Sequence, residues 1–216
     1  MKPWLDNTVD DKFAIEHIPC PHPGPVDLNK PPAGVMHTTE GTNWDSLVAE
    51  FKQHDTPTFM VAPHRIAQLV PLGSMAAALE HPPGTAPTNG WARVQIEVLA
   101  FSKESPYSFD AATSDTLASL LATLTVKCGI PLTRPFPDAM PPKPWAIQTF
   151  ARRKAGKWGT TAGWFGHIEI PSNSHWDPGA LRWSDLLAEA KKRIPLRAKL
   201  KPYYVVRVIQ GRLRRV

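Results

Sequence analysis

The sequence predicts an α/β fold, a single domain in which helices flank a central mixed β-sheet. Two largely apolar runs, Ala33–His37 and Arg93–Ala100, have the length and composition of buried strands. Apolar residues also recur at helical spacing, most clearly across Asp110–Cys128. A chain of 216 residues suits one domain and is long enough to bury a substantial core.

The first half of the chain adds further elements in order. Residues 1–32 are rich in proline and are interpreted as an irregular N-terminal arm. Asn43 is suited to cap a helix over Trp44–Gln53, in which apolar residues have helical spacing. Thr58–Ala62 and Ile66–Val70 predict a β-hairpin, because a short turn that begins with proline separates them.

A long helix and a long loop dominate the second half. The long helix is expected to end at Gly129, a residue type favoured at helix C-termini. Residues 131–165 are rich in proline and tryptophan and predict a loop of a length that is uncommon unless it has a function. Pro178–Arg193 predicts an amphipathic helix with its proline in the first turn. Residues 195–216 form a basic C-terminal extension, within which Tyr203–Ile209 is strand-like.

Charge and cysteine content narrow the class of protein. The chain has 25 basic and 19 acidic residues, a net charge of +6 and a sequence pI near 9.4. Such a balance favours binding to polyanions. The partner could be nucleic acid or the anionic polymers of a bacterial wall, and charge alone does not choose between them. Cys20 and Cys128 do not make a disulfide framework, and Cys128 is expected to be a buried thiol.

The sequence also bears on location. Met1–Asp11 has no apolar run after Lys2, so we expect no signal peptide. No stretch approaches the roughly 20 apolar residues of a membrane span. We therefore expect a soluble protein made in the cytoplasm, which another agent must deliver if its target lies outside the membrane. The oligomeric state is left open.

Three residues could hold a metal ion, namely His37 at the end of the first apolar run and His167 and Asp177 after the long loop. A catalytic zinc site uses three protein ligands and keeps one position open, and imidazole and carboxylate are suitable ligands. The spacing matches none of the short zinc signatures. Each residue also has an ordinary interpretation, since either histidine can hydrogen-bond locally and Asp177 suits a helix N-cap.

Four segments occur in an informative order along the chain. They are Gly34–Gly41, Val94–Val98, Gly166-His167 and Asp177-Pro178-Gly179. This arrangement resembles the type 2 N-acetylmuramoyl-L-alanine amidases, which share their fold with some phage lysozymes and with peptidoglycan recognition proteins. The resemblance implies a zinc amidase-like catalytic domain over residues 33–194. It also implies cleavage of the amide bond between N-acetylmuramic acid and L-alanine in peptidoglycan, as in a phage endolysin.

The resemblance implies roles for individual residues. The implied zinc ligands are His37, His167 and Asp177. Glu97 matches a glutamate that acts as general base in many members of the family. Where many members have a lysine that stabilises the oxyanion, this chain has His175, which could donate one hydrogen bond to it. The alternatives are that Glu97 pairs with Arg93 or another cation and that His175 only supports its loop.

Two regions leave the substrate contacts open. Many relatives have a Trp-His-Ala-Gly-like stretch on one wall of the groove, whereas this chain has Ser74–His81, in which no histidine aligns well. Aromatic and basic residues of the 131–165 loop could line the groove, although at least two of its three tryptophans are expected to pack the loop onto the domain. The residues concerned are Trp145, Trp158, Trp164, Arg152, Arg153, Lys154 and Lys157.

The expected partner is peptidoglycan, with no specific nucleic acid. The main alternative is a peptidoglycan-binding module of the same superfamily that does not cleave. Such modules usually lack a metal ligand, whereas all three positions are filled here. A nucleic-acid-binding protein would need a basic face with stacking aromatic residues, and no motif for one is present.

Overall fold

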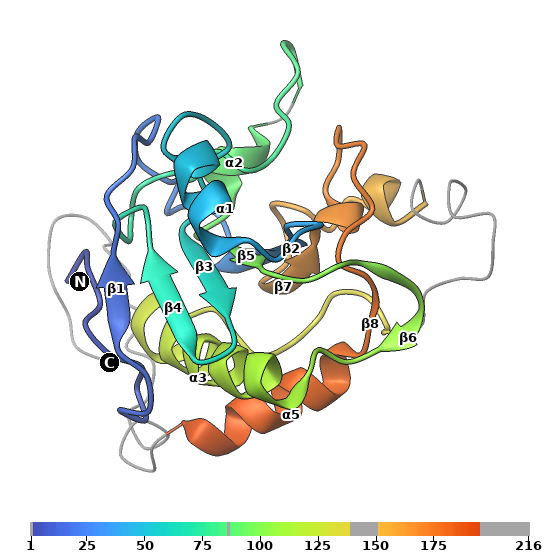
Figure 1. Ribbon diagram of the computed structural model, residues 1–216. Coiled ribbons are helices and arrows are strands. Elements are labelled where there is room, and N and C mark those ends of the chain that lie inside the picture. The colour runs from blue at the N-terminus through green and yellow to red at the C-terminus, as the bar shows by residue number, and fades with distance from the viewer. Residues whose placement is uncertain (1, 86, 139–150, 195–216) are drawn as a thin grey trace, which may run out of the picture.

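The computed structural model describes residues 2–85, 87–138 and 151–194, and helices and strands alternate along it (Figure 1). The strands are β1 (Ile15–His17), β2 (Ala33–Thr38), β3 (Phe59–Ala62), β4 (Arg65–Gln68), β5 (Val94–Val98), β6 (Lys103–Tyr107), β7 (Gly163–Gly166) and β8 (Gly179–Leu181). The helices are α1 (Trp44–Phe51), α2 (Thr88–Trp91), α3 (Ala111–Cys128), α5 (Trp183–Arg193) and the short 3-10 helix η1 (His167–Glu169).

A six-stranded sheet with the order β1-β4-β3-β5-β2-β7 forms the centre of the domain. Strands β3 and β4 are antiparallel, as the predicted hairpin requires, and the other neighbouring pairs of this sheet are parallel. Strands β6 and β8 pair separately as a small two-stranded sheet. The predicted fold class, an α/β domain with helices around a central mixed sheet, is therefore confirmed.

The two faces of the sheet bury different residues. Even-numbered residues of β2 and β5, such as Met36 and Ile96, belong to a core cluster with α3 and α5, which lie together below the sheet in Figure 1. Odd-numbered residues point to the opposite face, where Val35 packs in a separate cluster. His37 and Glu97 lie on this second face, so polar chemistry is separated from the main core.

Helices α1 and α3 begin as the sequence indicates. The side chain of Asn43 accepts a hydrogen bond from Ser46 N, and Asp110 caps α3 in the same way. Helix α3 ends at Gly129, whose φ of 71° is left-handed. Cys128 is buried, as expected, and burial raises the pKa of its thiol to about 12. None of the described helices is long and apolar enough to cross a membrane.

The segment predicted as one long loop is not continuous. Its last residues form β7, which pairs with β2 from Ala33↔Gly163 to Met36↔Gly166, so this part of the prediction is wrong. Trp158 and Trp164 are buried, with 5% and 0% of their surface exposed. These two tryptophans pack the segment onto the domain, as expected for at least two of the three. Trp145 lies outside the described residues.

The helix predicted over Pro178–Arg193 begins later, at Trp183. Residues Gly179–Leu181 instead form β8 beside β6, and the Asp177–Pro178 peptide bond is cis. Gly179 has a φ of 68°, which a right-handed helix cannot contain. Asp177 therefore does not cap a helix, and its carboxylate is available for another role. The strand-like run Tyr203–Ile209 lies outside the described residues.

The chain before β2 packs along the sheet. Its strand β1 lies at the edge of the sheet beside β4, and Leu5, Phe13 and Ile15 join the core cluster of α3. The buried side chain of Gln68 in β4 ties this segment down, because its Oε1 accepts from Leu5 N at 2.9 Å and its Nε2 donates to Pro3 O at 2.8 Å.

Close packing between β2 and β7 sets a size limit at Gly34. A Cβ there would overlap the indole ring of Trp164, whose side chain is fully buried. We expect Gly34→Ala to lower the free energy of unfolding by about 1–3 kcal/mol, measured by urea denaturation. Gly90→Ala in α2 is the control, because a Cβ there meets atoms at 3.5 Å and 3.8 Å, which is ordinary contact. Equal losses in the two variants would contradict the size limit.

Candidate metal centre

Three segments bring His37, His167 and Asp177 together at one edge of the sheet. His37 is the next-to-last residue of β2, His167 opens η1 directly after β7, and Asp177 precedes β8. Because β2 and β7 are parallel neighbours, their carboxyl ends lie at the same edge, and residues 130 positions apart can meet. All three side chains are buried, with 1%, 4% and 4% of the residue surface exposed.

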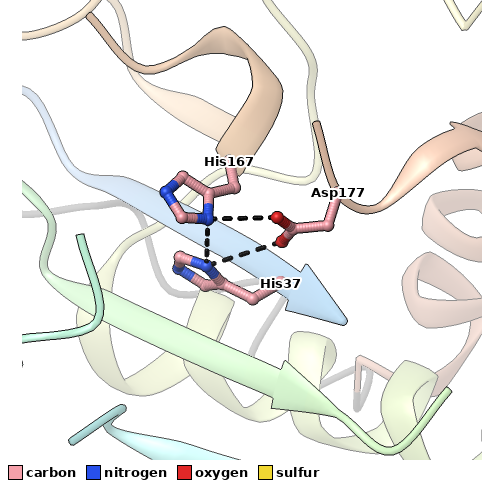
Figure 2. A group of neighbouring side chains, drawn as sticks. All are labelled: His37, His167 and Asp177. Atoms are coloured by element: carbon pink, nitrogen blue, oxygen red, sulfur yellow. Dashed lines mark hydrogen bonds and ion pairs between the residues drawn. The ribbon is translucent and has the colours of Figure 1, made fainter. Parts of the chain in front are cut away.

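The possible ligand atoms face one another across a small space (Figure 2). His37 Nδ1 lies 2.9 Å from His167 Nδ1 and 3.7 Å from Asp177 Oδ2, and His167 Nδ1 lies 3.2 Å from Asp177 Oδ1. In a tetrahedral zinc site with bonds of about 2.0–2.1 Å, neighbouring ligand atoms are about 3.3 Å apart. The observed separations lie on both sides of this value, so the donor set fits one metal ion.

Hydrogen bonds decide which nitrogen of His167 carries a proton. Asn173 Oδ1 lies 2.7 Å from His167 Nε2 and accepts the backbone N–H of Glu80, while its Nδ2 donates to Pro171 O. Oδ1 is thus an acceptor, and His167 donates from Nε2. In the neutral ring the lone pair of Nδ1 then faces the Asp177 carboxylate. These two acceptors repel unless a proton or a metal ion lies between them, which is the strongest indication of a cation site.

Burial and neighbouring groups set the charge states of His37 and Asp177. Burial, followed by the nearby His167, lowers the pKa of His37 to about 3, so this imidazole is neutral near pH 7. Burial alone would raise the pKa of Asp177, but its contact with His167 and the hydrogen bond that its Oδ2 accepts from Thr38 N at 3.2 Å lower it. A neutral imidazole and an ionised carboxylate are the forms that bind metals. Among the described residues, His37, His167 and Asp177 form the group of His, Cys, Asp and Glu residues suited to share one ion.

Glu97 lies beside this centre, in register with His37 on the neighbouring strand β5. Its Oε1 is 3.8 Å from His37 Nδ1, and its Oε2 is buried without a hydrogen-bond partner among the described residues. Burial raises the pKa of Glu97 well above its ordinary value, and nearby carboxylates, Asp177 first, raise it further. The hydrogen bonds of Arg93 run to backbone carbonyl oxygens elsewhere, so the alternative of a Glu97–Arg93 pair is not found. A buried carboxyl group that no cation neutralises is suited to exchange a proton.

His175 covers the outer side of the centre. Its ring stacks on His167 with centroids 4.8 Å apart and planes at 6°, and 60% of its side chain is exposed. Its Nδ1 lies 3.8 Å from Asp177 Oδ1 and its Nε2 lies 3.6 Å from Glu80 Oε1. Glu80 is itself held by the backbone N–H and the hydroxyl of Ser174. The structure therefore places a third imidazole, that of His175, at the rim of the centre beside His37 and His167.

The centre opens into a cleft of about 330 Å³ between the end of β2, α1 and the segment before α2. Leu47, Phe51 and Leu79 supply apolar surface to the cleft. Four further lining residues are acidic, namely Glu40, Glu50, Asp55 and Glu80. No lysine or arginine within the described ranges lines the cleft, so its charge is opposite in sign to the net charge of +6 of the chain.

The walls of the cleft differ from the sequence-based expectation. Within Ser74–His81, residues 78–80 line the cleft, whereas His81 is exposed and lies outside it. The basic residues of 151–157, before β7, do not face the cleft. Arg153, for example, donates to the backbone carbonyl oxygens of Ile168 and His175. The lining of the cleft includes none of Arg152, Arg153, Lys154 and Lys157.

Buried charges anchor the turn that carries His167. The carboxylate of Glu169 is fully buried and accepts two hydrogen bonds from Arg134, one from Arg152 and one from the backbone N–H of Gly166. Sequence reasoning missed both Glu169 and Asn173. The available signal was their position, since each is a polar residue within six positions of His167.

Comparisons with known proteins support the fold. No protein-family model matches the chain, and no curated protein matches it. Among solved structures, it is similar to the hydrolase AmiA of Staphylococcus aureus in complex with its ligand, with a TM-score of 0.56 and 13% identity over 83% of this chain and 82% of the other. A selenomethionine derivative of AmpD gives a TM-score of 0.55 and 14% identity, over 90% of this chain and 98% of the other. A mutant of PlyL gives a TM-score of 0.51 and 13% identity, over 83% of this chain and 99% of the other.

Of these similar structures, that of AmiA is described as a hydrolase in complex with its ligand. The chain has the fold of these structures, as the sequence resemblance implied. At identities of 13% and 14% the likeness shows the fold alone, and the chemistry has to be argued from the residues of the site.

Proposed function

We propose that this protein is a zinc-dependent N-acetylmuramoyl-L-alanine amidase, which hydrolyses the amide bond between N-acetylmuramic acid and L-alanine in peptidoglycan. The observation that carries the proposal is the convergence of three buried ligand atoms next to the buried carboxyl group of Glu97. Two imidazoles and one carboxylate leave a tetrahedral zinc ion one position for substrate or water. The hydrolase AmiA, which is similar in fold, is in line with a hydrolytic reaction.

In this proposal each residue around the centre has one task. Zinc, when bound, supplies a Lewis acid that polarises the scissile carbonyl group. Glu97, buried beside His37, takes a proton from the attacking water and passes it to the leaving amine. His175 donates a hydrogen bond to the carbonyl oxygen as negative charge develops there. Leu47 and Phe51 give the cleft an apolar wall against which the substrate can be oriented.

The second candidate is a protein that binds peptidoglycan without cleaving it. The observation in its favour is position 175, where a histidine replaces the lysine of many family members. The complete set of metal ligands favours catalysis instead. The acidic cleft would repel nucleic acid from this site. The proposed place of action is the bacterial wall, as for a phage endolysin.

Metal analysis and wall hydrolysis test the proposal together. The purified protein is expected to contain about one zinc ion per chain, and a chelator should stop the release of L-alanine amino termini from peptidoglycan until zinc is restored. His167→Ala should lose both zinc and activity. His81→Ala, at an exposed position outside the cleft, should lose neither. A zinc-free protein that binds peptidoglycan but releases no amine would favour the second candidate.

Glu97→Gln tests the general base. The amide has nearly the same size but cannot take the proton, so we expect kcat to fall by about 10²- to 10⁴-fold while zinc content is unchanged. Glu16→Gln in β1 is the control, because Glu16 is exposed and pairs with Arg65 far from the cleft. Retention of more than a tenth of the wild-type kcat by Glu97→Gln would assign the base elsewhere.

His175→Ala tests the oxyanion contact. We expect kcat to fall by about 10²-fold with little change in KM or zinc content, because the lost hydrogen bond forms only as the oxygen becomes negative. His175→Lys should retain most of the activity, since lysine can donate to the same oxygen. If His175 only supports its loop, kcat will survive in His175→Ala while the melting temperature falls.

A further inference from the structure

Gln95 is a buried carboxamide on the same face of the sheet as the candidate metal centre. It lies in the middle of β5, fully buried, two residues before Glu97. Strand β5 pairs with β2 in the register Val35↔Gln95 and His37↔Glu97, so Gln95 is a diagonal neighbour of His37. An uncharged polar side chain with no access to solvent needs hydrogen-bond partners, which raises the question of what its oxygen contacts.

The orientation of this amide is set by its nitrogen. Gln95 Nε2 donates to Asn89 Oδ1 at 2.9 Å and to the carbonyl oxygen of Ala76 at 3.4 Å. Asn89 is in turn fixed at both ends by Leu79, whose N–H it accepts at 3.0 Å and to whose carbonyl oxygen it donates at 2.7 Å. With both donors of Gln95 directed at acceptors, its Oε1 is the atom left to accept a hydrogen bond.

The other side of His37 supplies a matching donor. His37 Nε2 and Gln95 Oε1 are both buried, and neither has a hydrogen-bond partner among the described residues. The register of β2 and β5 places Gln95 two residues before Glu97, the partner of His37, and on the same face of the sheet, so the side chains of Gln95 and His37 are neighbours. The two atoms are therefore the natural partners of one another.

The tautomer of His37 decides whether its Nδ1 has a lone pair available for a metal ion. His167 presents the lone pair of its Nδ1, 2.9 Å from Nδ1 of His37. If His37 carried its proton on Nδ1, it would donate to His167, and the two imidazoles would satisfy each other without a metal. If the proton lies on Nε2, His37 Nδ1 presents a second lone pair, and the centre is ready for a cation.

We infer that Gln95 is a positioning residue, whose Oε1 accepts the proton of His37 Nε2 and so keeps His37 Nδ1 free to bind the metal. The inference rests on the proposed zinc site and deepens it. Asn173 does the same for His167, so each metal-binding histidine is directed by one carboxamide. Partners of this kind around metal-bound histidines commonly change metal affinity by about 10- to 100-fold.

The test measures zinc affinity and ring tautomers rather than turnover. Gln95→Leu should weaken zinc binding by about 10- to 100-fold, measured by competition with a chromogenic chelator. The matched control is Gln68→Leu, because Gln68 is equally buried in the same sheet but contacts the N-terminal segment. We expect that variant to be less stable but to bind zinc with the affinity of the wild type. Wild-type affinity in a folded Gln95→Leu would overturn the inference.

A second measurement reads the tautomer directly in the wild-type protein. Nitrogen-15 spectra of the metal-free wild type should show His37 protonated on Nε2, with the ring assigned from its absence in His37→Ala. Protonation on Nδ1 would overturn the inference. A wild type that binds zinc with this tautomer but cleaves no peptidoglycan would refute the amidase function and leave the role of Gln95 standing. A wild type that binds no zinc would overturn both the proposed function and the inference, because Gln95 would then position no metal ligand.

Discussion

Parallel pairing of β2 with β5 on one side and β7 on the other is the constraint on which the candidate centre depends. It places His37 beside Glu97 and carries the chain from β7 directly into His167. A shift of one residue in the register of β2 would turn its polar side chains into the apolar layer between the sheet and α3. That layer resists the slip, because Met36 and Ile96 are fully buried in it. Packing on one face of the sheet thus fixes the chemistry on the other.

Much of this fold could be predicted because β2, β5 and α3 have long, consistent burial patterns. Strands β7 and β8 could not, since each is short, contains glycine and is extended mainly because it pairs with a distant strand. The possible ligands were predicted through the family resemblance. Gln95 and Asn173 were missed because the role of a carboxamide depends on the atoms that face it after folding. The signal for Gln95 was its alternation with Glu97 within an apolar strand, which marks a polar face, whereas the signal for Asn173 was its position six residues after His167.

The centre combines groups that are unfavourable to bury separately. His37 is held neutral by burial, and Glu97 is buried without a cation among the described residues. A bound divalent ion would offset both costs, since it accepts the lone pairs of the ligands and attracts the neighbouring carboxylate. The anchoring of η1 through Glu169 and its two arginines supplies rigidity that the ligands themselves do not provide. Stability of this edge and its capacity for chemistry are therefore linked through the metal.

The acidic cleft has a consequence for the rate at which the centre acquires its ion. Glu40, Glu50, Asp55 and Glu80 surround the approach to ligands that are themselves buried. A concave surface of one sign concentrates counter-ions and accelerates their arrival, and added salt weakens the effect. In a chain with a net charge of +6, divalent cations would otherwise be repelled on average. If the centre binds a metal ion, the charge of the cleft walls would speed its arrival, although these residues are not themselves ligands.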